Sequence, residues 1–301
     1  MRTLALKVDV DTYRGTREGV PRLAKLLQQY QADATFLFSL GPDHTGRAIR
    51  RVFRPGFMQK VSRTSVVEHY GIKTLLYGTL LPGPDIARRC AGILRDIEQS
   101  GFETGIHTFD HIKWQDFVAH KNAAWTEREM QKAWQRFVDV FHHAPATHGA
   151  AGWQMNDDAF VQETRWGLRY ASDTRGTHPF IPVLANGQTA CPQLPTTLPT
   201  LDELIGVGDI DSHNVAQHIL ALTNAESPTG HVYTLHAELE GMKLAPVFEQ
   251  LLAGWKRQGY RLTSLATYFS EQNTQHLPRI PVIQGSLAGR SGTLALQAAQ
   301  A

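Results

Sequence analysis

Residues 4–40 read LALKVDVDTYRGTREGVPRLAKLLQQYQADATFLFSL, and this stretch decides the fold class. Residues 4–10 form a short, β-branched and apolar run, which is typical of a buried strand. In residues 16–30 the apolar side chains recur at helical spacing, and a second apolar run follows at 34–40. A strand, a helix and another strand in this order predict parallel strands joined by a crossover helix.

The alternation of strands and helices continues through most of the chain. Further strands are expected at residues 102–107, 146–149, 168–173, 231–236 and 261–265, and further helices at 85–100, 126–141, 157–166, 207–224 and 245–258. The count of about seven strands suits an α/β fold, an incomplete barrel related to the TIM type.

The composition excludes several classes of protein. The chain has 301 residues, 42% of them hydrophobic, and its 30 Lys+Arg against 28 Asp+Glu leave a net charge of +2. These values exclude a largely disordered chain and a general polyanion binder, so no nucleic-acid partner is expected. Two cysteines cannot form a disulfide framework. Lys7 and Asp9 interrupt the N-terminal apolar run, which excludes a signal peptide and favours a cytoplasmic protein.

The chain is predicted to form one catalytic domain over residues 1–275. Two segments interrupt the alternation of strands and helices. They are a long insertion at 41–84 and a Pro- and Thr-rich loop at 174–206. Loops of this length usually carry function or are disordered. Residues 276–301 are rich in Pro, Gly and Ala, and a flexible tail is expected there.

Titratable residues gather where the predicted strands end. Asp9 and Asp11 share one side of the first strand, because residues two apart point the same way. His107 and His111 follow the third; four apart, they would lie on one face of a helical turn and could share a metal. Two histidines and one aspartate leave an open position, as catalytic metal sites do. His236 ends a later strand. Taken one at a time, these residues could be a capping aspartate or an ordinary buried histidine. Their shared position at the ends of the predicted strands favours a catalytic site.

By these motifs the chain resembles the NodB-type polysaccharide deacetylases over about residues 3–270. That family comprises metal-dependent carbohydrate de-N-acylases on an incomplete (β/α)7 barrel. Its first aspartate motif, its His-[Ser/Thr]-x-x-His motif and its last histidine motif are matched by Asp9 and Asp11, by His107 and His111, and by Leu235-His236. The resemblance implies that Asp11, His107 and His111 hold one divalent ion, which could be Zn, Co, Mn, Ni or Fe. It also implies that Asp9 is the general base and His236 the general acid.

The chain departs from the family pattern at two places. One residue separates the two aspartates, which are more often adjacent. The third family motif usually carries an arginine that supports the base, and here the matching stretch HGAAG has His148 instead. In the same stretch, Ala151 is the candidate backbone donor to the oxyanion, and Asp173 is a candidate for orienting His236. The group that supports the base is not evident from the sequence.

Three stretches, VDVDTYRGTREGVP, THGAAGWQMND and HAELEG, are similar to one branch of that family. The branch removes the N-formyl group from a formamido-arabinose carried on undecaprenyl phosphate, for lipid A modification and polymyxin resistance. The resemblance implies a polyprenyl-phosphate-linked sugar as substrate and peripheral contact with the cytoplasmic face of the inner membrane. Candidate contacts to the substrate are Arg14, Arg17, Lys113, His148 and Arg175.

Residues 44–67 are a second candidate for contact with lipid. They contain six basic residues and no acidic one. On a helix, Phe53 and Phe57 would share the apolar arc, opposite Arg50, Arg51 and Arg54. A basic amphipathic helix of this kind can lie in a membrane interface. The alternative is an ordinary helix that packs on the barrel and leaves its basic face in water.

Other functions share some of these residues. A deacetylase of the same family that acts on a soluble or cell-wall sugar would have the same catalytic groups. Two histidines and a carboxylate also form the iron site of some oxygenases, although the alternation of strands and helices argues against that class. A lipid- or carbohydrate-binding module without catalysis would not need Asp9 or His236. The sequence thus favours a hydrolase of linear amides and leaves the metal, the oligomeric state and the preference for formyl over acetyl open.

Overall fold

The computed structural model describes residues 2–48, 71–290 and 292–299. The residues expected to contact the membrane, Arg50, Arg51, Phe53, Arg54 and Phe57, lie outside this part of the chain. Among the helices that are described, none is both long enough and apolar enough to cross a bilayer.

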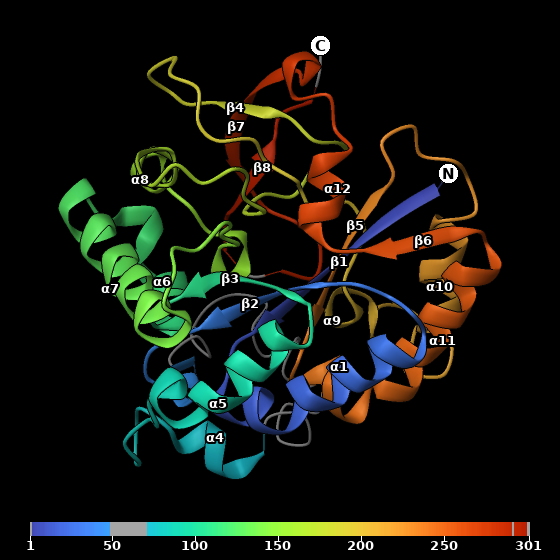
Figure 1. Ribbon diagram of the computed structural model, residues 1–301, viewed down its shortest axis with the longest axis horizontal. Coiled ribbons are helices and arrows are strands. Elements are labelled where there is room, and N and C mark those ends of the chain that lie inside the picture. The colour runs from blue at the N-terminus through green and yellow to red at the C-terminus, as the bar shows by residue number, and fades with distance from the viewer. Residues whose placement is uncertain (1, 49–70, 291, 300–301) are drawn as a thin grey trace.

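A parallel sheet around β1 (Arg2–Val10) forms the centre of the molecule (Figure 1). Its strand order is β3-β2-β1-β5, and β6 also pairs with β1. The other strands are β2 (Thr35–Ser39), β3 (Glu103–Thr108), β5 (His231–His236) and β6 (Tyr260–Thr263). β5 runs along one edge of β1. On the other edge, β6 pairs with the first half of β1 and β2 pairs with its second half. This sharing bends the sheet towards an incomplete barrel.

Helices cover one face of this sheet. They include η1 (Gly15–Gly19), α1 (Val20–Gln29), α5 (Ile86–Gln99), α7 (Ala123–Phe141), α10 (Val215–Leu222) and α11 (Ala245–Arg257). The shorter elements are α4 (Ile72–Leu76), α6 (His111–Phe117), η3 (Val118–His120), η4 (Ala151–Trp153), α8 (Asp157–Arg165), α9 (Leu201–Leu204), η5 (Leu239–Lys243), α12 (Leu265–Ser270) and η6 (Thr274–His276). α7 begins earlier than expected because the Asn122 side chain caps it by accepting from Trp125 N.

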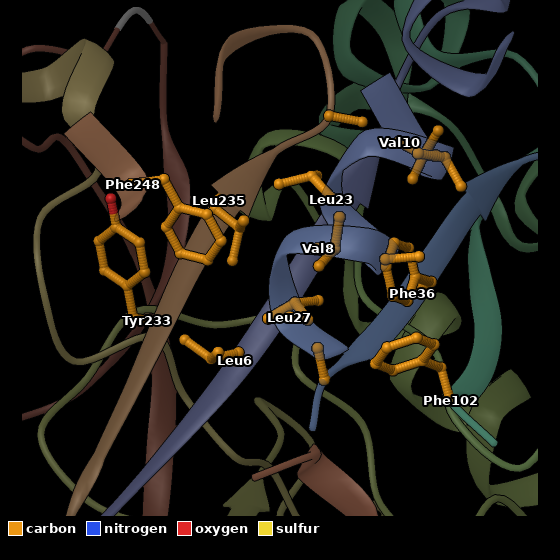
Figure 2. Close-up of a cluster of buried hydrophobic side chains, with 14 of the residues drawn as sticks. Leu6, Val8, Val10, Leu23, Leu27, Phe36, Phe102, Tyr233, Leu235 and Phe248 are labelled. Carbon is orange, nitrogen blue, oxygen red and sulfur yellow. The ribbon is translucent and has the colours of Figure 1, made fainter. Parts of the chain in front are cut away.

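The two faces of β1 have different roles. Leu6, Val8 and Val10 pack into the main apolar core with Leu23 and Leu27 of α1 (Figure 2). Each of these side chains is fully buried, and burial of one such side chain contributes about 1.5–3 kcal/mol. Because alternate residues of a strand point to opposite faces, the intervening side chains of β1 point away from this core. The opposite face is therefore free to carry polar groups.

The expected strands at 146–149 and 168–173 appear only as isolated bridges. Ile106 pairs with His148, and Ala171 pairs with Gln193. Backbone bonds still join these segments, since Gly149 N donates to Ile106 O and Ser172 N donates to His148 O. Buried polar side chains add to them: Ala150 N donates to Asp173, and Asp173 N donates to Gln193.

The C-terminal segment differs from the expected flexible tail. β7 (Arg279–Gly285) and β8 (Leu294–Gln297) form an antiparallel pair, and β7 also pairs in parallel with β4 (Ile181–Val183). This second sheet lies across the main sheet from α1 and α5 in Figure 1. The expectation of a loose segment is wrong for Arg279–Gly285 and Leu294–Gln297, which form strands, and Leu294 and Ala295 are buried there.

Candidate active site

Three candidate metal ligands converge from two strand ends and a helix start. Asp11 directly follows β1, His107 belongs to β3, and His111 is the first residue of α6. The Asp11 carboxylate lies 3.2 Å from His107 Nε2 through Oδ1 and 3.3 Å from His111 Nε2 through Oδ2. The two histidines thus meet as predicted, but not on one helical turn: a strand ends between them and a new helix begins. Their rings are 5.3 Å apart.

The donor chemistry of this triad fits a metal ion. His107 Nδ1 donates to Gly149 O at 2.5 Å, so a neutral His107 presents the lone pair of Nε2 to Asp11. Asp11 Oδ1 is buried and has no hydrogen-bond partner among the described residues. Burial by itself raises the pKa of Asp11, but the adjacent His111 and His107 hold it well below its usual range. Two imidazoles and one carboxylate whose ligand atoms converge in this way suit a divalent ion.

Asp9 and His236 lie side by side next to this triad. The two residues are paired in the register of β1 and β5, and both are buried. Asp9 Oδ1 lies 3.9 Å from His107 Nδ1. Neither Asp9 Oδ1 nor His236 Nδ1 has a hydrogen-bond partner among the described residues. A buried carboxylate oxygen and a buried ring nitrogen are therefore both available for proton transfer beside the triad.

Lys7 was not among the residues that the sequence singled out. Its side chain is fully buried on the same face of β1 as Asp9. Lys7 Nζ donates to Ser172 O at 2.8 Å and lies 3.5 Å from Asp9 Oδ2. The same ammonium lies 5.4 Å from the centre of the Trp153 ring. The sequence does contain a signal for this role, because Lys7 precedes Asp9 by two residues in a strand that is otherwise buried.

His148 belongs to a second buried polar cluster, together with Glu163 and Asp173. His148 Nδ1 lies 2.7 Å from Asp173 Oδ1 and 2.8 Å from Glu163 Oε1. Burial by itself lowers the pKa of His148, but Asp173 and Glu163 raise it to about 10. Burial and the charge of Asp173 raise the pKa of Glu163 well above its usual range. The cluster thus holds a buried imidazole against two carboxyl groups, which favour its charged form.

This cluster corrects two expectations. His148 is buried against carboxyl groups, which does not fit the predicted contact with substrate. Asp173 was a candidate for orienting His236, but its side chain bonds to His148, Gln193 and the backbone N–H of Ala150. The bonds from Asp173 to His148 and to Ala150 N hold the HGAAG segment in place. In this segment Ala151 is fully buried at the start of η4.

The four predicted basic contacts to substrate have partners within the protein. Arg14 and Arg17 lie 3.1 Å and 2.6 Å from Glu18, and Lys113 lies 2.7 Å from Glu129. The expectation is wrong for Arg175, which is buried and bonds to Glu203 Oε1 at 2.5 Å and to Leu198 O. A charged residue in a predicted loop is usually exposed, and the sequence does not show that Arg175 has a buried carboxylate partner.

Two glutamates after β5 tie the strand ends together. Glu238 Oε1 accepts from the backbone N–H groups of Asp11 and Thr12 and from the Thr12 hydroxyl. Glu240 Oε2 accepts from His236 N at 2.9 Å, and burial raises the pKa of Glu240 to about 7. The HAELEG stretch marked this loop, but its glutamates were not recognised as supports of the aspartate and histidine that they hold.

Solved structures define the class of fold. The chain is similar to a putative polysaccharide deacetylase from Mycobacterium smegmatis, with a TM-score of 0.63 and 16% identity over 95% of this chain and 96% of the other. It is also similar to the Xyl-CE4 domain of a multidomain xylanase from the hindgut metagenome of Trinervitermes trinervoides, with a TM-score of 0.51 and 11% identity over 90% of each chain. The fold is therefore that of the CE4 polysaccharide deacetylases, as predicted.

Curated relatives define the family more narrowly. A probable 4-deoxy-4-formamido-L-arabinose-phosphoundecaprenol deformylase of Shewanella sediminis (strain HAW-EB3) is 38% identical over 296 residues, which cover 98% of this chain and 94% of the relative. A protein of the same description from Wigglesworthia glossinidia brevipalpis is 28% identical over 94% of this chain and 98% of its own length. No protein-family model matches the chain. The chain belongs to the family of these deformylases.

Proposed function

We propose that this protein is a metal-dependent deformylase of undecaprenyl-phosphate-linked 4-deoxy-4-formamido-L-arabinose. Its products would be formate and the aminoarabinose lipid that serves lipid A modification and polymyxin resistance. The observation that carries the proposal is the meeting of the Asp11, His107 and His111 triad with Asp9 and His236. It stands in a chain 38% identical to a relative described as this deformylase.

The triad would hold one divalent ion. When bound, such an ion supplies polarisation of the amide carbonyl and a lower pKa for a water molecule. Gly149 O contributes by fixing His107 in the tautomer that leaves Nε2 free. The main chain at Asp11 is held in turn by Glu238.

The remaining groups move protons and stabilise charge. Asp9 uses its unpartnered Oδ1 to take the proton of the attacking water. His236 gives a proton to the departing nitrogen, because an amine leaves an amide only when protonated and a protonated imidazole is a proton donor. The backbone N–H of Ala151 is the candidate donor to the developing oxyanion, a contribution of about 3–4 kcal/mol for a well-placed donor.

Peripheral contact with the cytoplasmic face of the inner membrane follows from a substrate with a polyprenyl chain. Support comes from α4 and the turn after it, where Ile72 is 69% and Leu80 is 80% exposed and Leu81 is also exposed. Exposed apolar side chains gathered in one short segment are typical of interaction surfaces. We expect Leu80→Asp to weaken sedimentation with anionic liposomes without changing the metal content.

Formate release tests the function directly. Metal-stripped protein is supplied with single divalent metals and with the undecaprenyl-phosphate formamido sugar, and Asp11→Asn serves as the inactive control. Formate release that depends on added metal and is lost in Asp11→Asn supports the proposal. Cleavage of a soluble N-acetyl sugar without formate release from the lipid would instead point to a deacetylase on the same fold.

A further inference from the structure

We propose that Lys7 is a positioning residue that fixes the Asp9 carboxylate so that one of its oxygens stays free for proton transfer. The inference rests on the proposed deformylase function, in which Asp9 is the base. It concerns the support of this base, which no motif of the sequence supplies, since the stretch HGAAG has no arginine.

The first argument is the direction of the two side chains. Lys7 and Asp9 are alternate residues of β1 and therefore point to the same face, away from the apolar core. Lys7 Nζ lies 3.5 Å from Asp9 Oδ2, whereas Asp9 Oδ1 has no hydrogen-bond partner among the described residues. That free oxygen lies 3.9 Å from His107 Nδ1, on the side of the metal triad. The ammonium thus determines which carboxylate oxygen is anchored and which is free.

The second argument is that the position of the ammonium is itself fixed. Lys7 is fully buried, and burial of a charge is unfavourable unless the charge is paired and hydrogen-bonded. Nζ donates to Ser172 O at 2.8 Å and lies over the Trp153 ring. Gly149 packs closely here, because a Cβ at this position would lie 2.3 Å from Leu37 Cδ1, 3.0 Å from Lys7 Cε and 3.3 Å from Lys7 Nζ. A lysine held in this way cannot follow Asp9 if the carboxylate turns.

The third argument is the placement of Ser172. This residue precedes Asp173, whose carboxylate bonds to His148 and to Ala150 N. Ser172 N also donates to His148 O. The carbonyl that accepts from Lys7 therefore lies next to the cluster of His148, Glu163 and Asp173 and is tied to His148 through the backbone.

The experiment is a double-mutant cycle on formate release by the metal-loaded protein. Lys7→Met keeps the length of the side chain and removes its charge, Asp9→Asn removes the base, and the two are combined. Since misplacement of a catalytic group by about 1 Å lowers rates about 10²-fold, we expect Lys7→Met to lower kcat by about that factor. KM and metal content should stay within about threefold of the wild-type values, because Lys7 bonds to Ser172 O and pairs with Asp9 rather than with the candidate metal ligands. In the Asp9→Asn background the same substitution should lower kcat by less than about threefold.

Two further variants separate positioning from stability. Lys7→Arg keeps a charged donor and should restore kcat to within about tenfold of wild type. Arg290→Met is the matched control, because Arg290 also lies over the Trp153 ring but pairs with Asp202 and Glu203. It should lower the melting temperature while kcat stays within about threefold of wild type.

Each outcome has a distinct meaning. Wild-type kcat in Lys7→Met, or an equal loss in the wild-type and Asp9→Asn backgrounds, overturns the proposal for Lys7 while the deformylase function stands. The same holds if Lys7→Arg is as inactive as Lys7→Met while its melting temperature and metal content remain those of wild type. Absence of formate release by the metal-loaded wild-type protein overturns the proposed function and, with it, this inference.

Discussion

Two buried clusters of histidine and carboxylate lie close together in this protein, and both could hold a metal by composition alone. One is Asp11, His107 and His111, and the other is His148, Glu163 and Asp173. In each cluster the candidate ligand atoms lie within 4.8 Å of one another. The two clusters differ in the distances between those atoms and in the hydrogen bonds that the atoms make.

In the first cluster each histidine Nε2 lies 3.2–3.3 Å from an oxygen of Asp11. A tetrahedral ion with bonds of about 2.0–2.1 Å places its ligands about 3.3 Å apart, so this spacing suits a metal. In the second cluster the atoms are 2.7–2.8 Å apart, which is the distance of charge-assisted hydrogen bonds. The second oxygen of each carboxyl group also has a partner, because Gln193 donates to Asp173 Oδ2 and Cys191 Sγ donates to Glu163 Oε2. The short distances from one ring nitrogen to both carboxyl groups favour a hydrogen-bonded ion cluster over a metal site.

The largest expected difference between the two clusters is in metal binding. His107→Ala should remove the bound ion and lower formate release by at least about 10³-fold, because the ion and its open position carry the reaction. Asp173→Asn should leave the metal at its wild-type stoichiometry. Elemental analysis of both purified variants checks this, and a metal that is lost from the Asp173 variant alone would reverse the assignment of the two clusters.

The next effect is on stability. His148→Ala removes the cation from a buried pair and leaves Asp173 uncompensated, which typically costs about 3–5 kcal/mol. The expected result is a clear drop in the free energy of unfolding, measured by urea denaturation, at unchanged metal content. A variant as stable as wild type would show that the imidazole is not charged in the folded protein.

A smaller effect should appear as a dependence of stability on pH. Because the pKa of His148 is raised from 6.5 to about 10 in the folded protein, its stabilising contribution is fully present below pH 6.5. This contribution is lost as the pH rises towards 10. The melting temperature of wild type should therefore fall more steeply between pH 7 and 10 than that of His148→Gln. Parallel curves for the two proteins would contradict the charged cluster.

The smallest effect is expected at an exposed ion pair. Arg17 and Glu18 lie 2.6 Å apart at the surface, and such pairs contribute about 0.2–1 kcal/mol. Arg17→Ala should thus barely change the free energy of unfolding. If Arg17 binds the phosphate of the substrate, as the sequence predicts, the same variant should raise KM at unchanged kcat. Steady-state kinetics with the lipid-linked sugar decides whether this residue has a role beyond its ion pair.

Local patterns in the sequence determined a large part of this protein. The period of apolar residues in 4–40 specified β1, α1 and β2, because each element buries one side of its own chain. The positions of Asp11, His107 and His236 at strand ends followed from the same patterns. Parallel strands bring these ends to one edge of the sheet, so the candidate site could be assembled without a structure.

The tertiary structure alone decided which distant groups meet. Lys7 finds Ser172 O 165 residues further along the chain, and Arg175, expected in a loop, is buried against Glu203. Leu294 and Ala295 hold a segment that by composition resembled a flexible tail. No local period encodes such contacts, because they depend on how whole elements pack. The sequence by itself predicted which residues form the candidate metal site, and only the folded chain decided which buried charges lie beside them.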